Sequence, residues 1–499
     1  MLKINGLEKC FFTALFALSM LFGQTARAQD DKKTEPQEVK KESKKDEKEA
    51  KKDEKTPVKN TAKGRLPVIL IPGLIGSELV NKNSGDTVWF DLKRAKDDDL
   101  RLPVSQNLRA NKDNLVPRDI VREVQLIKLT PKIEIYQKLI DTLQADGFTE
   151  GKIDAPAAGG DADTFYVFPY DWRLDNVENA QILLEKLDSL RAKLNRPDLK
   201  FNVIAHSMGG LITRYALMYG DKDLNARTRP SWKGASYFNS LSLVAVPNAG
   251  ALQSLDSILN GFSFFGSGKI NLPFVQNLSR ADLFTIPSIY QLLPHAGTAR
   301  IFDENLKPVK LDLYNPAVWE KYGWAAYSDE DFAKKFDAAE QKNARAYFRA
   351  VLLRAKQFQA ALDASPTAKN PVPTYYLGAE CRPTIDGMII RQNEKKGKWV
   401  TEFEPSSYTK SNGAKVTKEE TEKVLLSPGD GVVSKRSLLS SFLRLGRLQN
   451  PNSSFILNAA PDACSEHNRL TGNEAVAKNL LSVVNGGTIT EATTTQAAK

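Results

Sequence analysis

Residues 201–217 carry the strongest structural signal in this chain of 499 residues. They read FNVIAHSMGGLITRYAL, so that an apolar strand runs into Ser207 and a helical pattern follows directly. A turn of this kind is sharp enough to leave the serine hydroxyl exposed above a sheet, and it needs small residues two positions before and after the serine. Ala205 and Gly209 satisfy that requirement. The segment therefore predicts a nucleophilic Ser207 on a strand–turn–helix unit.

Short apolar strands alternate with helical patterns along most of the chain. Strands are expected at 66–71, 164–168, 201–205, 241–246, 374–377 and 455–458. Helices are expected at 133–143, 178–194, 211–219 and 474–484, where apolar residues recur at helical spacing. This alternation is typical of an α/β protein with a mostly parallel sheet and helices on both of its faces.

The strand order is interrupted once, and the interruption divides the core into two parts. Residues 65–250 form the first part of the core, and residues 371–485 form the second part. Residues 251–370 between them show no sheet-like pattern, so we expect an inserted cap or lid domain there. The last residues, 486–499, are expected to form a flexible tail.

Two aromatic segments are candidates for contact with an apolar surface. Phe264 and Phe265 lie in a stretch, 261–275, that mixes large apolar side chains with glycines, which suits a mobile lid. The alternative is that these phenylalanines belong to the core of the cap. Trp89 follows the first strand and is a candidate for a smaller lid or membrane-contact segment, the alternative being a packed loop aromatic.

The first 28 residues have the pattern of a secretory signal peptide. A basic start precedes an apolar run, residues 11–22, that is too short for a stable transmembrane helix. Ala26-Arg27-Ala28 then offers a cleavage site before Gln29. We expect export to the periplasm or the extracellular space, the alternative being an uncleaved anchor. Cys10 precedes the apolar run, which does not suit a lipidation site.

Residues 29–64 are rich in lysine and glutamate and contain no aromatic side chain. Such a segment cannot bury enough apolar surface to offset its ordering entropy, so we expect a disordered tether. The whole chain has a formal net charge of +10, yet its basic residues are mixed with acidic ones. No basic stripe with interleaved aromatics is present, and we expect no nucleic-acid partner.

Cleavage of the signal leaves two cysteines, Cys381 and Cys464. An even number in an exported chain is compatible with one disulfide, although two unrelated buried thiols are the alternative. Cys464 lies three residues before His467, so a bond to Cys381 would hold the loop of that histidine against the sheet.

A nucleophilic serine needs a base, and the chain contains three histidines. His206 is the neighbour of Ser207 and should point elsewhere, and His295 lies within the inserted segment. His467 follows the last strand and fits the chain order serine, acid, histidine of this architecture. His467 is therefore the predicted base.

The acid is less clearly marked. Asp430 lies in a Pro-Gly-Asp-Gly turn before the last strand, and such a turn could present a carboxylate to His467. Asp386 follows the strand at 374–377 more closely, and Asp462 is a third candidate. The segment from residue 388 onward, between Asp386 and Asp430, is expected to be an inserted hairpin. These residues alone leave the choice open.

Several motifs occur together in one order: PVILIPGLIGSEL (67–79), FPYDWR (168–173), AHSMGG (205–210), AVPNAG (245–250), PSIYQLLP (287–294) and GDGVV (429–433), followed by His467. This set resembles the lecithin:cholesterol acyltransferase family over residues 65–485. That family has the α/β-hydrolase fold and includes diacylglycerol-acylating enzymes and lysosomal phospholipases with transacylase activity.

The resemblance implies a catalytic triad of Ser207, Asp430 and His467. It implies an oxyanion hole made by the backbone N–H groups of Leu74 and Met208. Asp171 and Arg173 of the FPYDWR motif are read as a buried scaffold pair, the alternative being a role in orienting substrate.

The activity implied is transfer of an acyl group from a lipid ester, through an acyl-serine, to an alcohol or to water. It requires no cofactor and no metal, and it suits transient contact with a membrane surface. Two alternatives are a general secreted carboxylesterase and a catalytically silent protein that binds lipids.

Overall fold

The computed structural model describes residues 64–90, 99–124, 132–224, 229–263, 266–267, 277–295, 297–393, 397–440, 453–458 and 464–489. The chain divides into two units, Met1–Asn60 and Thr61–Lys499, and every described residue belongs to the second. The predicted signal peptide and the tether up to residue 63 lie outside the described residues, as do most of the predicted tail, Phe264, Phe265 and Asp462.

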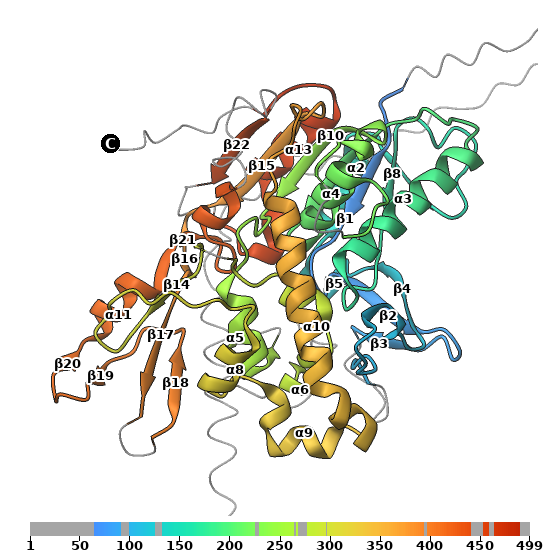
Figure 1. Cartoon of the computed structure of the whole chain (residues 1–499). Helices are drawn as coiled ribbons and strands as arrows, with labels where there is room; N and C mark the ends of the chain where they lie inside the picture. The colour runs from blue at the N-terminus through green and yellow to red at the C-terminus, as the bar shows by residue number, and fades with distance from the viewer. Residues whose placement is uncertain are drawn as a thin grey trace, which may run out of the picture. The chain divides into compact units, whose positions relative to one another are not determined.

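A seven-stranded sheet forms the centre of the second unit (Figure 1). Its order is β22-β15-β10-β9-β1-β8-β7, and every neighbouring pair is parallel. The strands are β1 (Val68–Ile71), β7 (Thr149–Gly151), β8 (Thr164–Val167), β9 (Phe201–His206), β10 (Phe238–Val244), β15 (Thr374–Ala379) and β22 (Ser453–Asn458). The predicted parallel sheet is thereby confirmed, and only β7 has no counterpart among the strands predicted from the sequence.

Helices cover both faces of this sheet because successive strand residues point to opposite sides. In β1, Val68 and Leu70 pack against α2 and α13, whereas Ile69 and Ile71 pack against α3 and α4. All four side chains are buried. The four helices are α2 (Gln137–Ala145), α3 (Asn176–Lys193), α4 (Met208–Tyr219) and α13 (Glu474–Val484).

Two predicted helices begin elsewhere in the structure. The helix expected at 133–143 begins only at Gln137, because Ile133–Glu134 (β6) pairs with Glu123–Val124 (β5) as a short antiparallel ladder. The helix expected at 211–219 begins at Met208, directly after Ser207. Strand pairing with a distant segment explains the first difference, since helical periodicity contains no information about that partner.

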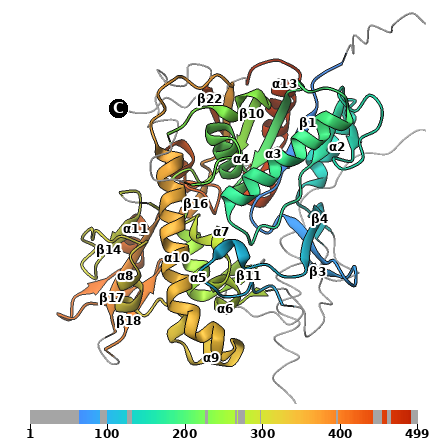
Figure 2. The same ribbon diagram turned by 45° about the vertical axis from the view of Figure 1, so that its right-hand side comes forward.

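The segment between β10 and β15 is mainly helical and has its own aromatic core. Phe284 lies at its centre, with ring contacts to Phe332, Phe336, Tyr347 and Phe348. The helices are α5 (Leu252–Asn260), α6 (Arg280–Phe284), α7 (Pro287–Tyr290), α8 (Pro316–Tyr322), α9 (Glu330–Lys335) and α10 (Ala338–Asp363). Figure 2 shows the long α10 running from this region up to the core helices. We call residues 251–370 the cap.

A small sheet joins the cap to a later part of the chain. Arg300–Phe302 (β14) pairs in parallel with Gly387–Gln392 (β17), which pairs in antiparallel with Trp399–Glu402 (β18). The hairpin expected after Asp386 is present as β17 and β18, and it pairs with the cap strand β14. The hairpin has a local pattern, whereas its parallel partner β14 is distant in sequence and leaves no local signal.

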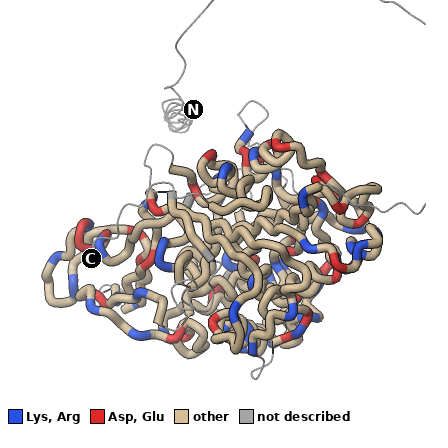
Figure 3. The backbone as a smooth tube through the Cα atoms, turned by 90° about the horizontal axis from the view of Figure 1, so that it is seen from above, with Lys and Arg blue, Asp and Glu red and all other residues tan. Residues whose placement is uncertain are grey.

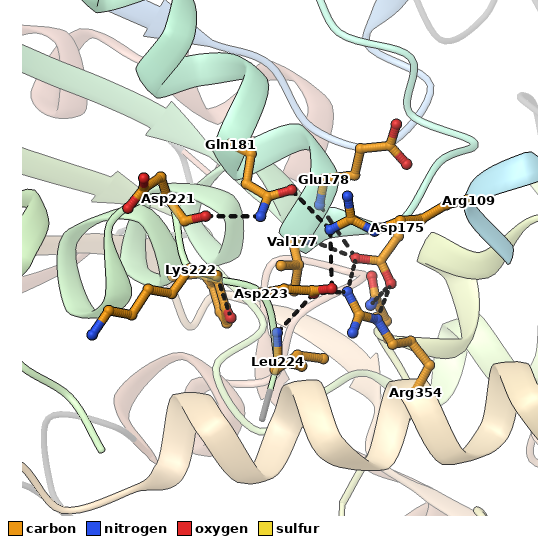
Figure 4. A network of polar contacts seen from close by, with 12 residues as sticks. Arg109, Asp175, Val177, Glu178, Gln181, Asp221, Lys222, Asp223, Leu224 and Arg354 are labelled. Atoms are coloured by element: carbon orange, nitrogen blue, oxygen red, sulfur yellow. Dashed lines mark hydrogen bonds and ion pairs between the residues drawn. The ribbon is translucent and has the colours of Figure 1, made fainter. Parts of the chain in front are cut away.

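Arg354 of α10 fastens the cap to the core (Figure 4). Its Nε lies 2.8 Å from Oδ2 of Asp175, and its Nη2 lies 2.5 Å from Oδ1 of Asp223. Asp175 is also the N-cap of α3, since its Oδ1 accepts the N–H of Val177 at 2.8 Å and that of Glu178 at 3.3 Å. One buried carboxylate therefore serves both the start of a core helix and the attachment of the cap.

Replacing Arg354 with methionine should destabilise the protein by about 3 kcal/mol, because it leaves the Asp175 carboxylate buried without its cation. The matched control is Lys356→Met on the same helix. Lys356 pairs with Asp312 at 2.8 Å in an exposed setting, and that pair should contribute less than about 1 kcal/mol. Urea unfolding of the two variants measures both losses. Equal losses would contradict this account of how the cap is held.

The surface of the described residues carries charges of both signs. Figure 3 shows Lys and Arg interspersed with Asp and Glu along the backbone. Among the residues that the structure describes, no helix is both long enough and apolar enough to span a bilayer.

Candidate active site

Ser207 lies at the turn between β9 and α4, in a backbone conformation that serine rarely adopts. Its φ is 52° and its ψ is −124°, and its N–H donates to the carbonyl of Val244 at 2.8 Å. Non-glycine residues with positive φ are strained, and they cluster at active sites where the surrounding structure enforces them. The strand, the turn and the helix thus hold the hydroxyl of Ser207 at the carboxyl edge of the sheet.

The two glycines after Ser207 are required by neighbours on both sides. A Cβ atom at Gly209 would lie 2.4 Å from the carbonyl oxygen of Pro72, beyond β1. A Cβ atom at Gly210 would lie 2.1 Å from Cγ2 of Val246, beyond β10. The start of α4 is therefore wedged between two loops, and the small residues expected from the sequence are needed for that close packing.

The structure brings Ser207, His467 and Asp430 into one series of hydrogen bonds. Nε2 of His467 lies 2.9 Å from Oγ of Ser207, and Nδ1 of His467 lies 2.8 Å from Oδ2 of Asp430. The backbone N–H of His467 also donates to the carbonyl of Asp430 at 3.1 Å. The three side chains follow β9, β21 (Leu426–Gly429) and β22, so the fold assembles them from three separate loops.

Asp430 is almost completely buried and is held as a carboxylate. Burial alone would raise its pKa, but the adjacent His467 and the N–H groups of Val432 and Val433 outweigh that effect and lower the pKa below its usual value. Those two N–H groups donate to Oδ1 at 3.0 and 2.7 Å. One carboxylate oxygen is thus fixed by the backbone, and the other faces the imidazole.

Asp386, a rival for the acid, serves a different cluster. Its carboxylate contacts Arg436 at 2.9 Å, Arg300 at 3.4 Å and the hydroxyl of Ser434 at 2.9 Å. Both oxygens are therefore engaged with side chains other than His467. Asp430 is the described aspartate that meets His467.

The two predicted oxyanion donors lie on either side of Ser207. Leu74 belongs to the loop after β1, and a Cβ atom at the preceding Gly73 would lie only 2.9 Å from Cβ of Ser207. Met208 is the first residue of α4, where the N–H groups of the first turn have no partner within the helix. Both positions suit the binding of a negatively charged oxygen.

Ser207 and His467 line a cavity of about 570 Å³. This volume is typical of sites that hold a small molecule. Much of the lining is apolar. The loop after β1 and other core segments contribute Leu74, Ile75, Val121, Ile135 and Trp172, and the cap contributes Phe262, Leu278, Leu283, Ile286, Ile289 and Leu292. Polar side chains also line it, among them Gln253, Asp256, Arg382, Glu404 and Glu466.

Trp89 is a packed aromatic, as in the alternative that the sequence left open, and it does not lie on a lid. Its side chain is fully buried, its Nε1–H donates to the carbonyl of Ile75 at 2.8 Å, and its ring contacts Trp172 at a centroid distance of 5.4 Å. The indole thus supports the loop after β1 from beneath. A tryptophan at the end of a short strand, here β3 (Thr87–Trp89), gives no sequence signal that separates these two roles.

Asp171 and Arg173 form part of the scaffold. Arg173 is fully buried and contacts Asp171 at 2.8 Å and Asp113 at 2.6 Å. Neither side chain of the FPYDWR pair lines the cavity beside Ser207, whereas Trp172 between them does.

A disulfide joins Cys381 to Cys464, with the two Cα atoms 5.9 Å apart. Cys381 lies two residues beyond β15, and Cys464 lies three residues before His467. The bond therefore ties the loop of His467 to a strand end of the central sheet.

His206 has contacts that the sequence analysis missed. Its Nδ1 lies 2.8 Å from the hydroxyl of Tyr136, and its Nε2 lies 3.0 Å from the carbonyl oxygen of His467. Burial, reinforced by the neighbouring His467, lowers the pKa of His206 to about 3, so the ring is neutral. The available signal was a histidine at the end of a mostly apolar strand, because a buried imidazole needs partners for its nitrogens.

Replacing His206 with glutamine should make the free energy of unfolding fall less steeply as the pH is lowered below about 6.5. The folded pKa is lowered to about 3, whereas an unfolded histidine titrates near 6.5, so unfolding takes up a proton between these values. The stability contributed by neutral His206 is complete above about pH 6.5 and is lost progressively as the pH falls toward 3. Between pH 7 and pH 5 the wild type should lose about 2 kcal/mol more than the variant. Urea unfolding at both pH values tests this, and equal losses would contradict it.

The described residues contain no group of three or more His, Cys, Asp or Glu side chains that could hold a metal ion.

A parallel sheet, a serine at a strand–helix turn, and an acid and a histidine on later loops together define the α/β-hydrolase fold. The sequence profile of the lecithin:cholesterol acyltransferase family matches residues 121–440, which is more than half of the chain. The chain belongs to the lecithin:cholesterol acyltransferase family.

One curated relative is lecithin-cholesterol acyltransferase-like 4 of Arabidopsis thaliana, 28% identical over 255 residues. The match covers 46% of this chain and 42% of the relative, so the chain spans less than half the length of that protein.

The solved structures to which this chain is similar have low sequence identities to it. A chain of the Tle4-Tli4 complex is 13% identical with a TM-score of 0.49, covering 84% of this chain and 98% of that one. The mature lipase BlEst2 of Bacillus licheniformis is 10% identical with a TM-score of 0.32, covering 86% and 96%. Lipase 1 from Pelosinus fermentans is 13% identical with a TM-score of 0.28, covering 85% and 97%.

Proposed function

We propose that this protein is an exported serine-dependent lipid acyltransferase and lipase that acts on acyl esters through an acyl-serine. The observation that carries the proposal is the hydrogen-bonded series Ser207–His467–Asp430 at the wall of a largely apolar cavity. A nucleophile, a base and a buried carboxylate in this order form the constellation used for acyl transfer.

In the proposed mechanism Oγ of Ser207 attacks the ester carbonyl while Nε2 of His467 accepts the hydroxyl proton. Asp430 orients the imidazole and stabilises the imidazolium that forms. The N–H groups of Leu74 and Met208 bind the oxyanion, and each such donor typically contributes about 3 kcal/mol. His467 then protonates the departing alcohol, which leaves the acyl-serine behind.

The second half of the reaction repeats these roles with a new nucleophile. Water or an alcohol enters the cavity, His467 removes its proton, and the acyl group leaves Ser207 as a free acid or a new ester. The apolar lining from the cap suits a fatty acyl chain, and it restricts water near the acyl-serine. We therefore propose that hydrolysis and acyl transfer both occur, with a ratio set by which acceptor reaches the site.

The proposed setting is the surface of a membrane outside the cytoplasm. The signal-like residues 1–28 support export, and the apolar and glycine-rich stretch around Phe264 and Phe265 supports contact with lipid. Both segments lie wholly or mostly outside the described residues, so these two parts of the proposal depend on the sequence.

The test uses phospholipid vesicles that contain a long-chain alcohol, with Ser207→Ala as the inactive control. Mass spectrometry of the products should find both free fatty acid and the alkyl ester with wild type, and neither with the variant. Hydrolysis of short soluble esters without turnover of vesicles would favour the carboxylesterase alternative. Absence of turnover on both substrates, with vesicle binding retained, would favour the lipid-binding alternative.

A further inference from the structure

Three loops of the candidate site are joined by hydrogen bonds that the triad does not include. The N–H of Gly73 donates to the hydroxyl of Tyr136 at 2.8 Å. That hydroxyl lies 2.8 Å from Nδ1 of His206, and Nε2 of His206 lies 3.0 Å from the carbonyl oxygen of His467. The series therefore runs from the loop after β1, through the residue before Ser207, to the loop of His467.

The directions of these bonds follow from the groups at the two ends. The carbonyl of His467 can only accept, so Nε2 of His206 carries the hydrogen, and Nδ1 of the neutral ring must accept. The hydroxyl of Tyr136 therefore donates to Nδ1 of His206 and accepts from Gly73 N–H. Each hydrogen in the series has one acceptor, so a single arrangement satisfies all of its groups.

Gly73, Tyr136 and His206 are buried and tightly packed. Tyr136 and His206 are each 5% exposed, and their rings meet edge to face at a centroid distance of 5.7 Å. A Cβ atom at Gly73 would lie 3.2 Å from Nδ1 of His206, so this loop approaches as closely as glycine allows. Burial also raises the pKa of Tyr136, which keeps its hydroxyl protonated and able to donate.

We propose that Tyr136 and His206 are positioning residues that set the distances between the predicted oxyanion donor Leu74, the nucleophile Ser207 and the base His467. The inference rests on the proposed function, because it assigns these residues to the same acyl-transfer site. Neither side chain takes a proton from the substrate. They hold the N–H of Gly73, one residue before Leu74, and the carbonyl of His467 in fixed positions relative to the serine turn.

This role predicts an effect on turnover that a scaffold residue would not have. Without the hydroxyl of Tyr136, the N–H of Gly73 and Nδ1 of His206 both lose their partner, so the loop after β1 can shift relative to Ser207. A displacement of about 1 Å at reacting groups can cost on the order of 100-fold in rate. Binding of the acyl chain uses the apolar cavity and should change little.

The experiment compares Tyr136→Phe with Tyr170→Phe in the full-length secreted protein. Tyr170 is a matched control, because its buried hydroxyl donates to the carbonyl of Pro72 on the same loop at 2.9 Å and does not contact His206. Active sites are counted with a fluorophosphonate, and kcat and KM on a short soluble ester are expressed per active site. Tyr136→Phe should lower kcat roughly 10- to 100-fold with KM nearly unchanged. Tyr170→Phe should lose stability and keep its kcat.

Variants of His206 supply the second readout. His206→Phe removes both hydrogen bonds and should lower kcat at least as much as Tyr136→Phe. His206→Gln keeps an N–H donor for the carbonyl of His467 and should recover part of that loss. A kcat per active site that is the same in Tyr136→Phe and Tyr170→Phe would overturn the inference. If wild type lacked turnover that depends on Ser207, the proposed function itself would fail, whereas unaltered turnover in Tyr136→Phe would remove the positioning role alone.

Discussion

Ser207→Ala and His467→Ala should each reduce turnover of an ester substrate by about 10⁴-fold or more, with the fold intact. The expectation follows from the 2.9 Å contact between Nε2 of His467 and Oγ of Ser207, because the hydroxyl is a weak nucleophile without a base. The two losses should not add in the double variant, since the residues act as one unit. Circular dichroism and steady-state kinetics on the purified variants measure both quantities.

Variants of Asp430, the acid of the series, and of its rival Asp386 provide a control for this prediction. Asp430→Asn should cost somewhat less than the loss of Ser207 or His467, because the base and the nucleophile remain. Asp386→Asn is the matched variant, since Asp386 is also a buried aspartate in a neighbouring loop but is bound to Arg436 and Arg300. It should lower stability and leave kcat intact. Loss of activity in Asp386→Asn with activity retained in Asp430→Asn would show that the acid is wrongly assigned.

Removal of the disulfide should lower stability by about 4 kcal/mol, because Cys381 and Cys464 close a loop with a sequence separation of 83. The double variant Cys381→Ala/Cys464→Ala is compared with wild type by urea unfolding. Thiol labelling of the oxidised, denatured wild type should find neither of these two cysteines reactive. Labelling of both, or an unchanged free energy of unfolding in the double variant, would exclude a stabilising role for this bond.

The parts of the site that sequence reasoning could locate are those with a local pattern. The turn at Ser207 was predictable because an apolar strand, two glycines and a helix are adjacent in the chain. His467 could be selected because only three histidines exist and one has the right order. Asp430 needed the family resemblance, since Asp386 also lies in a loop between strands. Arg300 and Arg436, which bind Asp386, are distant from it in the sequence, so the residues next to Asp386 do not indicate this pairing.

What could not be predicted depends on contacts between distant residues. Tyr136 and His206 are 70 positions apart, and their hydrogen bond exists only because the start of α2 lies next to the carboxyl end of β9. The pairing of β14 with β17 and the contact of Arg354 with Asp175 could not be predicted for the same reason, because each joins residues that are far apart in the sequence. For Trp89 the sequence left two roles open, because the same residue type suits a surface lid and a buried support.

Trapping of the acyl-enzyme tests the central claim most directly. The purified protein is mixed with an ester that turns over slowly, quenched in acid during steady state, digested and examined by peptide mass spectrometry. We predict one acyl group per protein, located on Ser207 in the peptide that contains the 205–210 motif. Turnover of the ester with the acyl group on another residue, or with no covalent intermediate on Ser207 under conditions that accumulate it, would contradict the account.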